Sequence, residues 1–252
     1  MFSHMTRSRT LGFLLLSLAA GFGAAQEGGD LQARIVYAFQ AEDTNELTNL
    51  VQTLTNQVKS GGADAALRYH LAHAQYRFGL LGGAKRSRDA PAAFSVCIDQ
   101  LKEILDQDSK SVEALALESA CYEQLAKYRR VEAVLLRSRA DERLKAAYAL
   151  APRNPRVLFL TAMDGLAGSK RGSRENNQAF AELQQAAQLF EQSSATREDV
   201  PGWGHAEAYL ALGIELQSRG DLLGARNWIE KALIAAPDYR AAQRQMATLV
   251  RR

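Results

Sequence analysis

The sequence is poor in residues that interrupt helices or cross-link chains. It contains five prolines and two cysteines among 252 residues. It also lacks segments in which valine, isoleucine or threonine alternates with polar residues, the pattern of half-buried β-strands. Alanine, leucine, glutamine, glutamate and arginine, which favour helices, are plentiful. We therefore predict an all-α protein.

A strong excess of either charge is also lacking. Lysine and arginine number 31 and aspartate and glutamate 28, so the formal net charge is +3. Nucleic-acid-binding proteins usually concentrate positive charge on one surface, and this overall balance does not indicate such binding. It does not indicate a membrane either, so any electrostatic function must depend on local clusters.

The sequence has one long apolar run, and it lies near the N-terminus. Leu11–Phe22 follows Arg7 and Arg9 and precedes small residues up to Ala25. This pattern is typical of a secretory signal peptide, so we expect residues 1–25 to be removed and the protein to be periplasmic or secreted. The alternative is an uncleaved membrane anchor, but the run of about 12 residues is shorter than the roughly 20 that span a bilayer.

The first helices are expected directly after this segment. Residues 26–29 are predicted to be a polar linker, and Asp30 and Thr44 to cap two helices, the second ending at Gly61-Gly62. This N-terminal pair, residues 26–62, would be an atypical first repeat or a cap, as the ends of repeat arrays require.

Further amphipathic segments fill the rest of the chain. Between residues 63 and 238 apolar residues recur at helical spacing, interrupted by turn residues such as Gly82-Gly83 and the segment 169–174. A last helix, residues 239–252, is expected to cap the C-terminus with Ala242, Met246 and Leu249 directed inward. The sequence therefore predicts successive helix pairs followed by a closing helix.

The clearest pair is Ala206–Asp238. It reads AEAYLALGIELQSRGDLLGARNWIEKALIAAPD, with small residues at Gly213 and Ala225, a glycine at Gly220 and a proline at Pro237. In these spacings the segment resembles a tetratricopeptide repeat, a helical hairpin of about 34 residues. The resemblance implies a right-handed α-solenoid of stacked antiparallel helix pairs, with longer copies upstream of this one. The alternative is a generic helical bundle.

The resemblance also assigns a packing position within each pair. Gly213, Ser119 and His73 would lie where the two helices of a pair approach most closely, which favours a small side chain. His73 departs from that rule and indicates a wider pair or a different register.

A binding surface follows from the same resemblance. The first helix of each pair would line a concave groove that accepts a peptide or helix with apolar anchors. The alternative is that the apolar groove positions pack against the extra C-terminal helix. The implied groove positions are His70, Ala74, Arg77, Ala116, Ala120, Glu123, Phe159, Met163, Leu166, Leu210, Ile214 and Gln217.

Basic residues gather in the loops inside the pairs, and in a regular solenoid these loops would form one edge. Such an edge could contact anionic lipid or an acidic protein. The alternative is that these side chains are simply solvated and complement helix dipoles. The residues are Lys85, Arg86, Arg88, Lys127, Arg129, Arg130, Lys170, Arg171, Arg174 and Arg219.

The two cysteines, Cys97 and Cys121, fall toward the same end of neighbouring predicted helices. They could form a disulfide in an oxidising compartment or remain buried thiols. The sequence has no HExxH, P-loop or Gly-x-Ser-x-Gly motif, and His70 and His73 lack further metal ligands at suitable spacing. We therefore expect no enzyme, cofactor or metal, and predict a protein-binding scaffold. The alternative is an envelope-associated structural protein that docks to anionic lipid.

Overall fold

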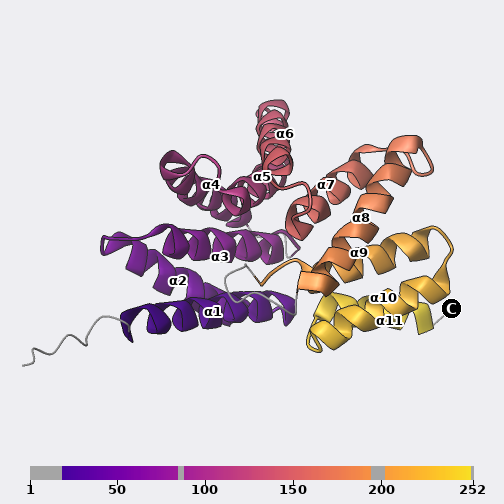
Figure 1. The fold of residues 1–252 in the computed structure, drawn as a ribbon, viewed down its shortest axis with the longest axis horizontal. Coiled ribbons are helices and arrows are strands. Elements are labelled where there is room, and N and C mark those ends of the chain that lie inside the picture. Colours follow the sequence, from indigo (N-terminus) through magenta and orange to yellow (C-terminus); the bar gives the residue numbers. More distant parts are fainter. Residues whose placement is uncertain (1–18, 85–87, 194–201, 251–252) are drawn as a thin grey trace, which may run out of the picture.

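The computed structural model describes residues 19–84, 88–193 and 202–250, and the regular structure in these ranges is entirely helical, as predicted (Figure 1). The helices are α1 (Ala19–Gln40), α2 (Thr44–Lys59), α3 (Ala65–Ala84), α4 (Ala90–Gln107), α5 (Val112–Ala126), α6 (Ala133–Leu150), α7 (Pro155–Gly168), α8 (Arg174–Ser193), α9 (His205–Ser218), α10 (Leu222–Ala235) and α11 (Arg240–Val250).

Neighbouring helices pack in the order of the chain. The pairs α3–α4, α5–α6, α7–α8 and α9–α10 have the most extensive contacts, and α2–α3, α4–α5 and α8–α9 join successive pairs. Each helix presents an alanine- and leucine-rich stripe that it cannot bury alone, so stacking creates the core. The molecule is an all-α, solenoid-like array of helix pairs.

The N-terminal helix differs from its prediction. α1 begins at Ala19 and is continuous to Gln40, so residues 26–29 are not a linker and Asp30 does not cap a helix. The alanines around the glycines are strong helix formers and explain this continuity. The expected cleavage point after Ala25 therefore falls inside α1, and residues 1–18 lie outside the described ranges.

The second helix is capped one residue earlier than predicted. Asp43, not Thr44, is the cap, and its Oδ1 accepts hydrogen bonds from the backbone N–H groups of Asn45 and Glu46 over 3.1 and 3.0 Å. The carboxylate accepts from two backbone N–H groups that have no partner within the helix. Its negative charge also interacts favourably with the positive end of the helix dipole.

Two glycines predicted to break α3 lie within it. The prediction of a break at Gly82-Gly83 was wrong because α3 uses glycine for close packing. A Cβ at Gly79 would lie 2.6 Å from Cε1 of Phe94, and one at Gly83 would lie 2.6 Å from the hydroxyl of Tyr128. The missing side chains thus admit aromatic rings from α4 and from the turn after α5.

The close approach expected at Gly213 is present. A Cβ there would lie 2.6 Å from Cγ1 of Ile229 and 3.0 Å from the carbonyl oxygen of Ala225, so α9 and α10 are in direct contact. At the equivalent position of α5, the Ser119 hydroxyl donates to the carbonyl oxygen of Ala140 in α6 over 2.8 Å.

The regular stacking is interrupted after α6. α6 packs along α5 but makes only slight contact with α7, and the contact of α7 with α5 is equally slight. As a result α6 projects from the rest of the molecule (Figure 1). Its buried residues form one stripe that faces α5: Leu136, Ala140, Leu144 and Ala147.

The first and last helices of the array meet. The Tyr37 hydroxyl at the end of α1 donates to Asp238 over 3.2 Å, and Arg244 of α11 is paired with Glu42 over 2.5 Å. The C-terminal helix is present as predicted, with Ala242 buried and Met246 and Leu249 packed on the same core. Within the described ranges, none of the helices is long and apolar enough to cross a membrane.

The two cysteines form a disulfide, the first of the two alternatives left open by the sequence. Cys97 in α4 and Cys121 in α5 are completely buried, with their Cα atoms 6.4 Å apart. The bond joins two neighbouring helix pairs inside the core that contains Phe94 and Leu117.

Candidate partner-binding groove

The predicted groove positions on α3 do not face an open groove. Ala74 is completely buried, and Arg77 is 3% exposed. The Nη2 atom of Arg77 donates to Glu207 of α9 over 2.7 Å, and its guanidinium lies 4.4 Å from the centre of the Phe39 ring. Glu207 also accepts from the backbone N–H of Gly204 over 3.1 Å. Arg77 thus connects two helices that are 130 residues apart in sequence.

A chain of side chains extends this buried network to α1. The Nε atom of Arg77 donates to Nε2 of His73 over 2.9 Å. The side-chain amide of Gln32 lies between His73 and His70, 3.0 Å from Nδ1 of each ring. A protonated imidazole has no acceptor nitrogen, so the bond from Arg77 requires neutral His73. Burial, and then the cation of Arg77, hold the pKa of His73 well below its usual value.

This network explains why a histidine occupies a position expected to be small. His73 takes part in a hydrogen-bonded connection between α1, α3 and α9 and is completely buried. The ring of Trp203 stacks beside it with the centroids 5.7 Å apart, and the Trp203 indole N–H donates to the Tyr69 hydroxyl over 2.9 Å. The surface of α3 that the sequence assigned to a partner is therefore covered by Trp203 and Glu207 of the same chain.

We predict that His73 makes stability depend on pH. Because its folded-state pKa lies below the unfolded value, the unfolded chain binds more protons as pH falls below about 6.5. The free energy of unfolding should therefore fall by about 1 kcal/mol when the pH is lowered from 7.5 to 5.5. Urea unfolding of wild type and His73→Gln at both pH values measures it, since glutamine does not titrate. The difference isolates His73 from His70 and His205, whose pKa values burial also lowers. An equal pH dependence in the two proteins would contradict the assignment.

At the C-terminal end, the predicted groove is also largely occupied. Leu210 is buried, and Phe159 and Leu166 pack on the same core as α11. The side chain of Gln217 is hydrogen-bonded to Gln245 of α11. These contacts favour the alternative in which the C-terminal helix covers the apolar positions. Ile214 remains 43% exposed.

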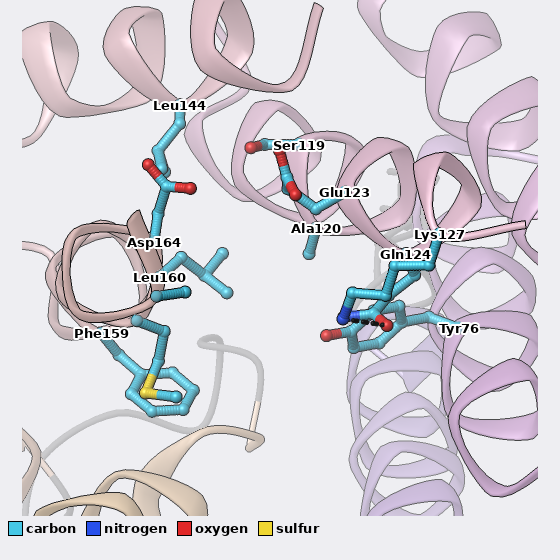
Figure 2. Close-up of a pocket in the computed structure, with 12 residues that line it drawn as sticks. Tyr76, Ser119, Ala120, Glu123, Gln124, Lys127, Leu144, Phe159, Leu160 and Asp164 are labelled. Atoms are coloured by element: carbon cyan, nitrogen blue, oxygen red, sulfur yellow. Dashed lines mark hydrogen bonds between the residues drawn. The ribbon is translucent and has the colours of Figure 1, made fainter. Parts of the chain in front are cut away.

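An open pocket remains in the middle of the array, between α5 and α7. It has a volume of about 310 Å³ and includes four predicted groove residues, Ala120, Glu123, Phe159 and Met163. Figure 2 shows Glu123 on α5 and Asp164 on α7 on opposite sides of this pocket. The remaining lining residues are Tyr76, Ser119, Gln124, Lys127, Leu144, Leu160 and Ala167.

The two carboxyl groups of the pocket are partly desolvated. Burial raises the pKa of Glu123, and the negative charge of Asp164 raises it further. The pKa of Asp164 is raised by burial and by the charge of Asp141. Arg137 and Lys127 lower the pKa of Glu123, and Lys145 lowers that of Asp164, but the net shift of both pKa values remains upward. A cation placed between them would stabilise their ionised forms.

Several polar side chains of this pocket are already hydrogen-bonded within the protein. The Ser119 hydroxyl is already engaged with the carbonyl of Ala140, and the lining residues include no histidine that could act as its base. Lys127 donates to the Gln124 side chain over 2.9 Å (Figure 2). Phe159, Leu160 and Met163 give the α7 wall an apolar surface, on which a side chain of a partner could be buried.

The predicted basic edge is only partly described and is not uniform. Lys85 and Arg86 lie outside the described ranges, and Arg88, Arg129, Arg130, Lys170, Arg171 and Arg174 are exposed. Arg174 is the first residue of α8 instead of a loop residue. Arg219 is half-buried against the Phe180 ring, 4.1 Å from its centre, and is hydrogen-bonded to Glu215 and Asn176. Its contacts are those of a packing residue.

The histidine pair of α3 has internal partners. His70 and His73 share Gln32, and in the described ranges no three histidine, cysteine, aspartate or glutamate side chains come together as metal ligands would.

The sequence matches no model of a known protein family, and no curated protein matches it either.

Sequence reasoning missed two residues that shape this surface, Asp164 and Glu207, whereas Trp203 could be predicted as a packing residue, and it is buried. Asp164 follows Met163 directly, and its carboxyl group could have been inferred as a neighbour of the groove from that spacing. Trp203 stands between Gly202 and Gly204 in an irregular segment, a setting in which a large ring can be placed deep in a neighbouring core. Nothing in the sequence pairs Glu207 with Arg77, which is 130 residues away.

Proposed function

We propose that this protein is a non-enzymatic scaffold of the tetratricopeptide-repeat type that binds a segment of a partner protein. The observation that supports this most directly is the pocket between α5 and α7, because it combines an apolar wall with two desolvated carboxyl groups. It lies on the first helices of two successive pairs, where the resemblance places the groove.

The chemistry of the pocket indicates what the partner segment carries. Met163 is 40% exposed and stands with Phe159 and Leu160 on one side, so an apolar side chain would lose water there. Glu123 and Asp164 provide negative charge, which Lys127, Arg137 and Lys145 nearby offset only in part. A lysine or arginine near the apolar anchor would complement them. We therefore assign the pocket to a segment with an apolar and a basic side chain close together.

We further propose that the protein acts after export. The Cys97–Cys121 disulfide suits an oxidising compartment, where such bonds form and persist. Removal of residues 1–25 would be compatible with the fold, since the residues of its apolar cores begin at Leu31.

Selection from a random peptide library displayed on phage tests the proposed binding. We expect the chain from Gln26 onward to enrich peptides in which a leucine or other large apolar residue is close to lysine or arginine. A synthetic peptide of the selected sequence should bind Glu123→Gln/Asp164→Asn about tenfold more weakly. Affinity should also fall as pH decreases from 7 to 5, because the raised pKa values mean that the carboxyl groups lose their charge early.

The matched control is Glu142→Gln, which removes a carboxylate from an exposed position on α6 outside the pocket. It should leave affinity unchanged. Enrichment of peptides without basic residues, or equal binding by Glu123→Gln/Asp164→Asn and Glu142→Gln, would refute the proposed site.

A further inference from the structure

The start of α6 and the turn before it carry large apolar side chains that are mostly exposed. Val131 is 100% exposed, Val134 82% and Leu135 54%. Val134 and Leu135 lie on the side of α6 opposite the stripe that packs on α5, which contains Leu136 and Ala140. Side chains in a helix lean toward its N-terminus, so Val134 and Leu135 point in the direction of the preceding turn and Val131.

This apolar end is surrounded by positive charge. Residues 127–139 contain five basic residues and one acidic residue, Glu132. Arg129 and Arg130, in the turn, and Arg137, on α6, are all exposed. Arg129 pairs with Glu132 over 3.3 Å, an exposed contact that contributes little to stability. We call the segment from Lys127 to Arg139 the α6 tip.

The tip has a firm base on the rest of the protein. Arg143, further along α6, is paired with the buried carboxylate of Glu118 over 2.8 Å, and Ser119 donates to Ala140. Because α6 has only slight contact with α7, it projects from the molecule while its buried stripe holds it against α5 (Figure 1). Tyr128 and Arg129, in the turn before α6, contact Phe94 and Ser95 of α4. The tip is therefore a convex, positively charged projection with an apolar end.

We propose that the α6 tip docks the protein peripherally on an anionic lipid surface. Such a surface offers phosphate groups and, a few ångströms deeper, hydrocarbon, which matches arginines placed around exposed valine and leucine. The first N–H groups of α6 add to this, since Glu132 makes no side-chain cap. A second copy of the tip is a poor partner, because two clusters of the same charge repel each other. The tip replaces the long basic edge as the lipid-binding element.

Vesicle co-sedimentation of the chain from Gln26 onward tests this docking. The wild type should bind vesicles of phosphatidylcholine mixed with phosphatidylglycerol, and high salt should weaken binding. It should bind vesicles of phosphatidylcholine alone much less. Val131→Ser/Val134→Ser should lower the partition coefficient about tenfold, because it removes the inserted apolar groups. Arg129→Gln/Arg130→Gln should lower it by a similar factor through lost attraction to phosphate.

The matched control is Leu222→Ser/Leu223→Ser, which removes an exposed apolar pair from the first turn of α10, beside the acidic cap Asp221. This variant should bind vesicles as the wild type does. All substituted side chains are exposed, so circular dichroism should show unchanged helix content. Failure of the wild type to bind, equal binding to both vesicle types, or unchanged binding of Val131→Ser/Val134→Ser would overturn the proposal. If sedimentation equilibrium instead shows that the wild type is a dimer and Val131→Ser/Val134→Ser a monomer, the tip is an interface between copies.

Discussion

Replacing Glu207 by alanine is expected to lower the free energy of unfolding by about 3–5 kcal/mol, because the guanidinium of Arg77 would remain buried without its carboxylate. The ion pair has a distance of 2.7 Å, with side-chain exposures of 4% and 9%, so water cannot readily replace the lost partner. Glu207 also accepts from the N–H of Gly204, and that bond would be lost too. Guanidinium chloride unfolding monitored by circular dichroism measures the change.

A second ion pair between the same ends of the array provides the control. Arg244 and Glu42 are much more exposed, with side-chain exposures of 62% and 35%. Arg244→Gln should therefore cost at most about 1 kcal/mol. The variant Arg77→Met/Glu207→Leu should be more stable than Glu207→Ala, since neither buried charge remains. If Glu207→Ala lowers the free energy of unfolding no more than Arg244→Gln does, the buried Arg77–Glu207 ion pair does not hold the two ends together.

Loss of the disulfide is expected to cost about 3 kcal/mol, the entropy regained by an unfolded chain freed from a loop of this length. Cys97 and Cys121 are 24 residues apart, and both lie in the core shared by α4 and α5. Cys97→Ser/Cys121→Ser should unfold at lower denaturant concentration than the oxidised wild type. Parallel unfolding curves with and without dithiothreitol give the difference.

The reductant itself supplies the internal comparison. The wild type should lose stability on reduction, whereas Cys97→Ser/Cys121→Ser should not respond to dithiothreitol. Cys97→Ala/Cys121→Ala separates the effect of the bond from that of buried hydroxyl groups, because alanine leaves no unsatisfied polar atom. A wild type whose stability is unchanged by dithiothreitol would contradict a stabilising bond.

The helix pairs could be predicted because their signals are local. In the segment from Ala206 to Asp238, apolar spacing, Gly220 and Pro237 together specify two helices and the turn between them. Gly82-Gly83 carried a misleading local signal, because a glycine pair is typical of a break. Tyr128 occupies the space that the missing side chain of Gly83 leaves, as Phe94 does at Gly79 of the same helix. Tertiary packing therefore overrode the low helix propensity of glycine.

The groove was harder to predict because its occupancy depends on distant residues. Repeat spacing can place Arg77 on the first helix of a pair, but it cannot show that Glu207 fills the space opposite. The exposure of the α6 tip could not be predicted for the same reason. Valine and leucine at positions 131, 134 and 135 are residue types typical of a core. Their exposure follows from the slight contact between α6 and α7, a weak point in the stacking that local periodicity does not record.

The contacts between the first and last helices also bear on how the chain folds. In an open repeat array each unit touches its neighbours alone, so units can form one after another and fray from the ends. Here Tyr37 meets Asp238 across 201 residues, and Glu42 meets Arg244 across 202. Closing so long a loop costs chain entropy before the contacts between the ends form, and we therefore expect slower folding than for an open array. In return, the terminal helices protect each other, and the whole chain should exchange its amide hydrogens as one cooperative unit.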